Sequence, residues 1–213
     1  MNAGKTNGPH FRGNAFQITE SLLLVEVAMK KFAIFGLVFA LVVVARRSNA
    51  QENSEMPAPQ KEHEWLKQLA GEWDTEGEMH IGPGAEPIKS TGTDIARMLG
   101  GFWLVSDVKG NVMGTSVEAK LTIGYDTKKK KYVGTWIDSM TSYMWNYEGS
   151  VDESGKILTL NTEGPGFQGG DKLTKFKEVI EIKSKDERTF TSSYQNEDGT
   201  WTKLMSVKYR RKK

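Results

Sequence analysis

Two carboxylates occupy positions where their neighbours on the same strand face are apolar. Alternation through residues 136–138 places Asp138 on the same side as Trp136. Glu178 alternates in the same way with Phe176. A charged carboxylate that is buried without a partner is costly, so each group would need a cation, a polar ligand or water. Both are therefore candidates for a binding site inside the protein.

Each carboxylate also has a purely structural interpretation. Asp138 could stand at the end of its strand and accept hydrogen bonds from backbone N–H groups of the turn at 139–142. Glu178 could form an ion pair inside the protein with Arg97 or a lysine, or a β-bulge could turn it outward. The sequence leaves these alternatives open.

The sequence gives little support to catalysis by a cysteine, a metal ion or a serine nucleophile. The chain has no Cys, which excludes disulfides, thiolate metal sites and a cysteine nucleophile. After residue 50 the histidines are His63 and His80, too few for a typical zinc site, so we expect no metal and no cofactor. No Gly-x-Ser-x-Gly nucleophile motif is present. An enzyme of this sequence would rely on paired carboxylates, such as Asp138 and Glu148.

The region that holds these residues alternates between apolar and polar positions from Trp73 onward. Turn residues interrupt the alternation about every dozen positions, as at Gly82-Pro83-Gly84 and Glu197-Asp198-Gly199. The pattern predicts ten strands, near 73–81, 87–98, 102–108, 116–124, 131–138, 142–150, 156–162, 172–183, 188–195 and 200–211. Short connections favour an antiparallel meander, and strands with one apolar face must close or stack. We therefore predict an all-β fold, a single antiparallel meander β-barrel.

A short helix is expected directly before the first strand. Trp65, Leu66 and Leu69 fall on one helical face, so we expect this helix to plug one end of the barrel. In the last strand, alternation places Trp201, Met205, Val207 and Tyr209 on one face.

Gly71-x-Trp73, which follows this helix and opens the first strand, resembles the signature of the calycin barrels, the lipocalins and their relatives. The resemblance implies that Trp73 closes one end of the barrel. It also implies that a basic side chain from the last strand stacks over Trp73, and Arg211 is the matching residue, with Arg210 as the alternative. Such a cation–π contact contributes roughly 0.5–2 kcal/mol.

A longer set of motifs resembles a bacterial family called "domain of unknown function 1579" over about residues 60–213. The motifs are Met98-Leu99-Gly100-Gly101-Phe102-Trp103-Leu104, Gly124-Tyr125-Asp126, Tyr132, Thr135-Trp136-Ile137-Asp138-Ser139-Met140, Glu148-Gly149, Asp152-Glu153-Ser154-Gly155-Lys156 and Tyr209-x-Arg211-Lys212. The resemblance implies a calycin-like fold and members that are often exported. It implies no particular activity.

We expect the barrel to bind a small, partly apolar molecule in its interior, because small barrels either fill their lumen or hold one ligand. The candidate lining residues are Trp103, Trp136, Asp138, Met140, Trp145, Glu148, Glu178 and Tyr194. Two alternatives remain: an envelope-associated scaffold or interaction protein with a filled barrel, and an enzyme that uses interior carboxylates. An exposed aromatic patch on the outer face of 142–150 would favour the scaffold.

The N-terminal region has the features of an export signal. Met29-Lys30-Lys31 precedes an apolar run of 14 residues, 32–45, and Ser48-x-Ala50 is a small-x-small exit. As a helix the run spans about 21 Å, short for a bilayer core of about 30 Å. We therefore expect a cleaved signal peptide at 29–50, with an uncleaved anchor as the alternative.

The boundaries that follow are a misassigned or extended N-terminus at 1–28, the signal at 29–50, a linker at 51–61 and the barrel at 62–213. Location in the periplasm or outside the cell is the corresponding expectation. Residues 1–50 contain six Lys or Arg and two Glu, whereas the remaining residues contain 23 basic and 25 acidic side chains. A near-neutral body lacks the positive field that nucleic-acid binding needs, and we expect contact with a membrane only through an uncleaved signal.

Overall fold

The computed structural model of the protein describes residues 57–82, 84–166 and 173–213. The proposed N-terminal extension, the signal segment and most of the linker lie outside these residues. The barrel belongs to the unit Ala58–Lys213.

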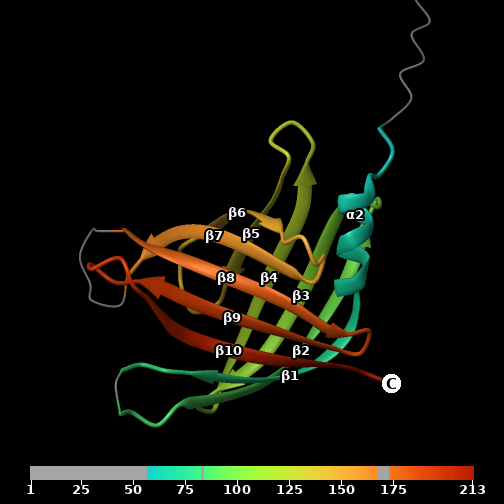
Figure 1. Ribbon diagram of the computed structural model, residues 1–213. Helices are drawn as coiled ribbons and strands as arrows, with labels where there is room; N and C mark the ends of the chain where they lie inside the picture. Colours follow the sequence, from blue (N-terminus) through green and yellow to red (C-terminus); the bar gives the residue numbers. More distant parts are fainter. Residues whose placement is uncertain (1–56, 83, 167–172) are drawn as a thin grey trace, which may run out of the picture. The chain divides into compact units, whose positions relative to one another are not determined.

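Ten antiparallel strands form a closed barrel in which each strand pairs with its neighbours in the sequence (Figure 1). The strands are β1 (Gly71–Met79), β2 (Ile88–Leu99), β3 (Trp103–Val112), β4 (Thr115–Asp126), β5 (Lys131–Asp138), β6 (Trp145–Val151), β7 (Ile157–Pro165), β8 (Leu173–Ser184), β9 (Glu187–Gln195) and β10 (Trp201–Arg211). β1 pairs with β10 in a register that sets Trp73 opposite Arg211 and Met79 opposite Met205. Closure leaves no unpaired sheet edge, and the prediction of an antiparallel meander barrel is confirmed.

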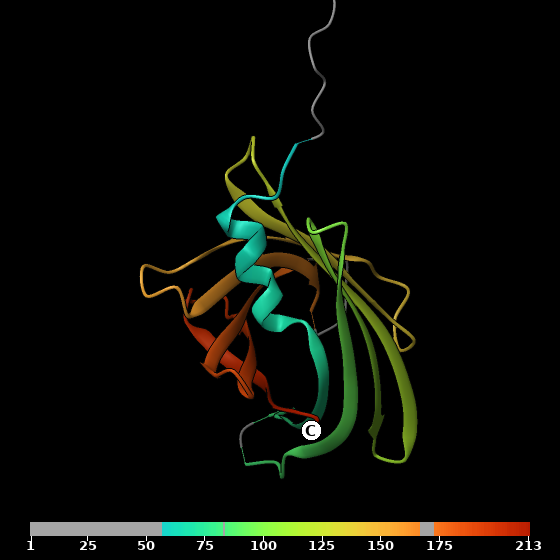
Figure 2. The same cartoon turned by 90° about the vertical axis from the view of Figure 1, so that its right-hand side faces the viewer.

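A short helix lies across one end of the barrel, as the sequence predicts (Figure 2). It consists of α2 (Lys61–Leu66) and a following 3₁₀ turn, η1 (Lys67–Leu69). His63 is buried and its Nδ1 accepts a hydrogen bond from the Gln60 backbone N–H, which caps the first turn. Two hydrogen bonds tie the helix to the strands, from Tyr132 Oη to the Glu62 carbonyl and from Trp65 Nε1 to the Gly155 carbonyl.

The apolar core of the barrel packs against this helix. Its buried members are Leu66, Leu69, Ala96, Leu104, Ile123, Tyr132, Leu158, Leu160 and Ile180. The end of the barrel that α2 covers is called the helix end below. The opposite end, formed by the last residues of β1, β3, β5, β7 and β9, is called the far end.

Strand β3 continues to Val112, beyond residue 108, where the sequence predicts that it ends. Gly110 instead lies inside the sheet, opposite Gly92 of β2. A Cβ atom on Gly92 would overlap the Lys109 carbonyl oxygen, so the absence of a side chain lets these two strands approach closely. The turn itself uses Met113 and Gly114, both with positive φ.

A β-bulge in β10 corrects the prediction for the last strand. The register shifts between Lys203 and Met205, and the extra residue, Leu204, is buried. Met205 and Val207 face the interior, whereas Trp201 faces outward. The prediction that all three share a face is wrong because one inserted residue reverses the alternation of everything before it.

Candidate functional site

The interior of the barrel differs between its two halves. At the helix end, inward-facing side chains such as Leu104, Ile123 and Leu158 have no accessible surface. Farther along the strands, Ala119, Phe176 and Ser192 face inward and are buried, but other inward-facing side chains are only partly buried. The partly buried ones are Val117, Leu121, Trp136, Trp145, Tyr147, Phe190, Tyr194, Met205 and Val207. Because these side chains point into a closed barrel, the surface that they retain borders the lumen.

The helix end is sealed by Trp73, as the sequence predicts. Trp73 is buried, its Nε1 donates to the Leu69 carbonyl, and the guanidinium carbon of Arg211 lies 4.1 Å from the centre of its ring. Arg211 also donates to the carbonyls of Ala70 and Gln68. Gly71 is required here because a Cβ atom would overlap the Arg211 Nη1, and because its φ is +131°.

An ion pair inside the barrel at the same end is absent from the sequence predictions. Arg188 Nη2 donates to Asp94 Oδ2 at 2.7 Å, and Ser106 Oγ donates to Asp94 Oδ1. Both charged side chains are almost fully buried. Burial raises the pKa of Asp94, and the charge of Arg188 opposes this rise. Strand alternation indicates the inward position of Arg188, because Arg188 and Phe190 are two residues apart on one strand and point to the same side.

Arg188 is also the second cation that contacts the aromatic seal. Its guanidinium carbon lies 4.1 Å from the ring centre of Tyr209 and 4.8 Å from that of Trp73. Burial raises the pKa of Tyr209 to about 12. Trp73 thus contacts two guanidinium groups, of which the sequence predicted one, although the buried Arg188 Nε has no hydrogen-bond partner.

Glu178 lies inside the barrel, as alternation predicts, but without the expected cation. Ser192 Oγ donates to Glu178 Oε1 at 3.0 Å, and Glu178 Oε2 has no hydrogen-bond partner. Arg97, the partner considered from the sequence, faces outward and binds Asp107. Burial raises the pKa of Glu178 to about 8, so the side chain carries a proton at neutral pH.

Asp138 stands at the end of its strand and accepts backbone hydrogen bonds from the turn, which is the structural alternative given above, and its side chain also faces the interior. Its Oδ1 accepts hydrogen bonds from the backbone N–H groups of Met140 and Thr141, which caps the turn after β5. Its Oδ2 accepts from Trp136 Nε1 at 2.8 Å. Asp138 therefore orients the Trp136 ring at the far end of the lumen.

Trp145 and Tyr194 face the interior, as predicted. Trp145 packs edge to face against Phe176, with ring centres 5.0 Å apart, and against Tyr143. Tyr194 lies opposite Phe176 on the neighbouring strand. Strand β6 begins only at Trp145, so Tyr143 belongs to the preceding turn, where its Oη donates to the Glu163 carbonyl.

Three predicted lining residues do not line the interior. Trp103 faces outward, is 42% exposed and covers Gly124. Met140 is exposed in the turn after β5, because Asp138 ends the strand there. Glu148 alternates with inward-facing Tyr147 and so faces outward.

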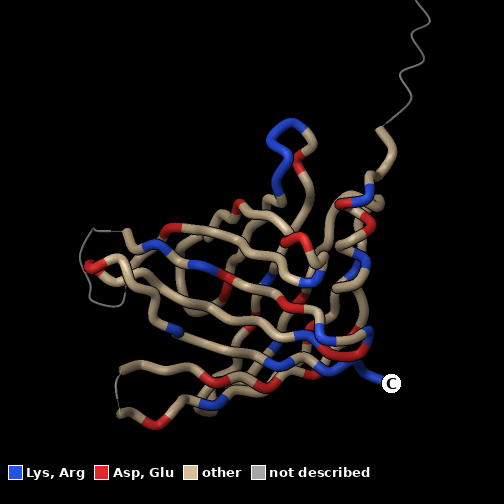
Figure 3. Tube along the Cα trace, in the orientation of Figure 1, with Lys and Arg blue, Asp and Glu red and all other residues tan. Residues whose placement is uncertain are grey.

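The outward position of Glu148 also removes the carboxylate pair considered for acid–base catalysis, because Asp138 lies on the other face of the wall. Glu148 instead binds Lys129 Nζ at 2.9 Å. Lys129 belongs to the lysine run 128–131 at the β4–β5 hairpin, visible as a basic tip in Figure 3.

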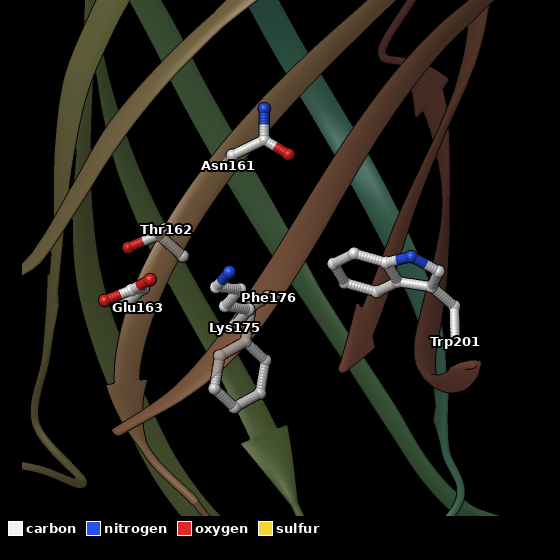
Figure 4. Close-up of a pocket in the computed structure, with 6 residues that line it drawn as sticks. All are labelled: Asn161, Thr162, Glu163, Lys175, Phe176 and Trp201. Carbon is white, nitrogen blue, oxygen red and sulfur yellow. The ribbon is translucent and has the colours of Figure 1, made fainter. Parts of the chain in front are cut away.

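Two hollows of about 360 Å³ each adjoin the barrel wall, and outward-facing residues make up most of their lining, although Thr162 and Phe176 of the first and Asp138 of the second face inward. The first runs along β7 and β8, with Trp201 standing apart at the start of β10; its lining residues are Asn161, Thr162, Glu163, Lys175, Phe176 and Trp201 (Figure 4). Lys177 Nζ stacks over the Trp201 ring at 4.1 Å. The second is bordered by Asp107, which binds both Arg97 and Lys120. In the second hollow the charged groups are paired, Asp107 with Lys120 and Lys109 with Glu118.

Among the residues that the structure describes, no group of three or more His, Asp or Glu side chains is placed to hold a metal ion. Within the same residues, no helix has both the length and the apolar character needed to cross a membrane.

The fold resembles solved structures at low sequence identity. The crystal structure of Rv2717c from M. tuberculosis aligns with a TM-score of 0.53 and 10% identity, over 73% of this chain and all of that one. EF1p2_mFAP2b bound to DFHBI aligns with a TM-score of 0.39 and 11% identity, over 71% and 99% of the two chains. A de novo designed fluorescence-activating β-barrel aligns with a TM-score of 0.39 and 14% identity, over 69% and 96%.

No curated protein has a significantly similar sequence. The family model described as "Protein of unknown function (DUF1579)" matches residues 58–211, from the residues before the helix to the last residue of β10. This match spans the whole barrel and includes Gly71, Trp73 and Arg211 at its sealed end. The chain therefore belongs to the DUF1579 family of proteins of unknown function.

Proposed function

We propose that the protein binds a small, partly apolar molecule in the far half of its barrel lumen. One observation carries the proposal: the inward-facing aromatic side chains Trp136, Trp145 and Tyr194 keep accessible surface there, whereas Leu104, Ile123 and Leu158 at the helix end keep none. Small barrels either fill their lumen with side chains or hold one ligand, and exposed inward-facing rings favour the second arrangement. Mixed aromatic and polar lining is typical of small-molecule sites.

The outer face of β6 gives no support to the alternative role as an interaction scaffold. Asn146, Glu148 and Ser150 are its exposed side chains, and the aromatic rings of Trp145 and Tyr147 turn inward. The aromatic patch that would favour a partner protein is therefore not formed by this strand. The small-molecule proposal remains the one that the interior supports.

A neutral apolar fluorophore such as Nile red tests the site directly. Two tryptophans of opposite orientation provide matched variants: Trp136→Leu alters the lumen, and Trp103→Leu alters the outer wall. We expect the lumen variant to weaken dye binding about tenfold or more and the outer variant to change it less than about twofold. Equal effects of the two substitutions, or no binding of the dye to the unaltered protein, would contradict the proposal.

Native mass spectrometry of the protein purified from its own source is the complementary experiment. A co-purifying small molecule, lost when Trp136 is replaced, is the expected result. Detection of the bare polypeptide alone, from a preparation in which non-covalent complexes survive, would count against a resident ligand.

We also propose that residues 29–50 direct export, on the basis of the sequence pattern alone. N-terminal sequencing of the protein from the envelope or the medium is expected to begin at Gln51. A sequence that begins at Met1 in the cytoplasmic fraction would refute this part of the proposal.

A further inference from the structure

The far half of the lumen contains acidic but no basic side chains among the strand positions that the structure describes. Asp138 points inward at the far end, and Glu178 points inward about midway along β8. The lysines of the same strands, such as Lys120, Lys175 and Lys177, alternate onto the outer wall. The two guanidinium groups associated with the interior, Arg188 and Arg211, lie at the helix end, where each is already bound.

The two most deeply buried carboxyl groups of the described residues differ in their hydrogen-bond and ion-pair partners. Asp94 receives a cation from Arg188 and a hydroxyl from Ser106. Glu178 is 6% exposed and receives a single hydroxyl, that of Ser192, while its Oε2 has no partner. Leaving a buried carboxyl oxygen without a hydrogen bond is costly, so its retention at this place suits a group that binds a ligand.

A second polar atom without a partner lies close to Glu178. Thr162 on β7 faces inward, pairs with Phe176 and is therefore diagonal to Glu178 across the β7–β8 pair. The Thr162 Oγ1 is buried and has no hydrogen-bond partner. Tyr147 on β6 is near enough that the charge of Glu178 helps to raise its pKa, although burial is the larger cause. Glu178, Thr162 and Tyr147 thus form a polar group in an otherwise aromatic interior.

Aromatic side chains lie near Glu178 in the sheet, because Tyr194 and Phe190 are diagonal to it across the β8–β9 pair. Trp136, Trp145, Tyr147, Phe190 and Tyr194 all face inward and retain accessible surface. The face of an aromatic ring attracts a cation, and it does so more strongly when the site excludes water. A carboxylate among aromatic rings is the chemistry that recognises an ammonium group.

We infer that the lumen ligand is an apolar amine whose ammonium group binds Glu178 and packs against the aromatic rings of the far half. This inference rests on the proposed function, and it specifies the ligand's polar end. The amine supplies the positive charge that Glu178 lacks and that Asp94 obtains from Arg188. Thr162 Oγ1 is a second acceptor for the N–H groups of the same ammonium.

Binding requires two local changes. Glu178 Oε2 is shielded from solvent in this structure, so a side chain that covers it must turn aside, and Tyr147 is the neighbour with lumen-facing surface. Glu178 also holds a proton at neutral pH, and this proton leaves to solvent when the ammonium ion binds. One cation is gained and one proton released, so the charge of the interior balances.

Isothermal titration with three probes of equal chain length tests the inference: hexylamine, 1-hexanol and hexanoate. We expect hexylamine to bind about tenfold or more tightly than 1-hexanol, and hexanoate to bind most weakly, because the interior offers it two carboxyl groups and no free cation. Glu178→Gln keeps the shape of the side chain and is expected to abolish the preference for the amine. It is expected to leave 1-hexanol binding within about twofold.

Glu148→Gln is the matched control, since it makes the same substitution on the outer wall of β6. It is expected to keep the full preference for hexylamine. If Glu178→Gln does not fold, the comparison of the three probes on the unaltered protein decides the question alone.

The outcomes separate this inference from the proposed function. Equal binding of hexylamine and 1-hexanol, or an amine preference that survives Glu178→Gln, overturns the inference; Glu178 is then a structural, protonated side chain, and the lumen still binds apolar molecules. If none of the three probes and no neutral dye binds, the proposed function fails together with the inference.

Discussion

The Arg188 guanidinium and the Asp94 carboxylate meet at 2.7 Å inside the barrel, although 94 residues separate them in the sequence. They come from β9 and β2, which are separated in the sheet by β1 and β10. Their contact therefore exists only because the barrel closes, and it joins the first and last parts of the chain.

The first prediction concerns this ion pair. Arg188→Met leaves Asp94 buried without a cation and is expected to lower the free energy of unfolding by about 3–5 kcal/mol, measured by urea denaturation. Arg210→Met breaks an exposed pair with Glu76 and is expected to cost less than about 1 kcal/mol. Similar costs for the two substitutions would show that the buried pair is not a stabilising contact. Adding Asp94→Asn to Arg188→Met is expected to recover part of the loss.

The second prediction concerns the glycine beside the aromatic seal. Gly71→Ala places a Cβ atom on the Arg211 guanidinium and requires φ of +131°, so we expect the stability to fall by about 2 kcal/mol or more. Gly155→Ala serves as the comparison, because Gly155 also has positive φ but faces open space. Gly155→Ala is expected to lower the free energy of unfolding by about 1 kcal/mol, because it brings only the unfavourable positive φ and no clash. Thermal or urea unfolding of both variants checks this, and equal losses would argue against the clash.

The third prediction is a pH dependence of stability. The pKa of Glu178 is raised from 4.5 to about 8 in the folded protein, so over this range the folded state holds a proton that the unfolded state has released. Stability from this group is therefore complete below about pH 4.5 and is lost as the pH rises toward 8, by at most about 1.4 kcal/mol per pH unit.

Urea unfolding at pH 5, 6, 7 and 8 measures this slope. Glu178→Gln is expected to flatten it, whereas Glu148→Gln on the outer wall is expected to leave it unchanged. Other titratable groups of the interior are Tyr147, on which the charge of Glu178 acts, and Asp94, which is paired with Arg188. A slope that persists in Glu178→Gln would assign the titration to one of those groups instead.

The fourth prediction concerns the helix that covers the barrel. Leu66 has no accessible surface, so Leu66→Ala is expected to cost about 2–5 kcal/mol through lost burial and the cavity that remains. Lys61→Ala, in the same helix but on its exposed side, is expected to change stability by less than about 0.5 kcal/mol. Guanidinium unfolding followed by Trp fluorescence gives both values. A small effect of Leu66→Ala would mean that the helix packs only loosely on the barrel.

Alternation alone gives the orientation of many side chains. Trp136, Trp145, Glu178 and Tyr194 face inward as their strand positions predict, since successive residues of a strand point to opposite sides. The same rule applied to Glu148 points outward, in agreement with the structure.

Trp201 shows where alternation fails. The rule holds only while no residue is inserted, and the bulge at Leu204 has no clear mark in the sequence. Met140 fails for a related reason, because the strand ends at the turn that Asp138 caps. Local features of the chain thus decide where each periodic pattern starts and stops.

By itself, the sequence determined the number of strands, their order, the helix before them and the inward side of most of them, because these depend on short-range alternation and turn residues. The tertiary structure decided which buried charges meet and which remain alone. Arg188 reaches Asp94 and leaves Glu178 without a cation, because closure of the barrel sets the register of strands far apart in the sequence. Pairing between distant strands is a property of the closed sheet, and no local pattern specifies it.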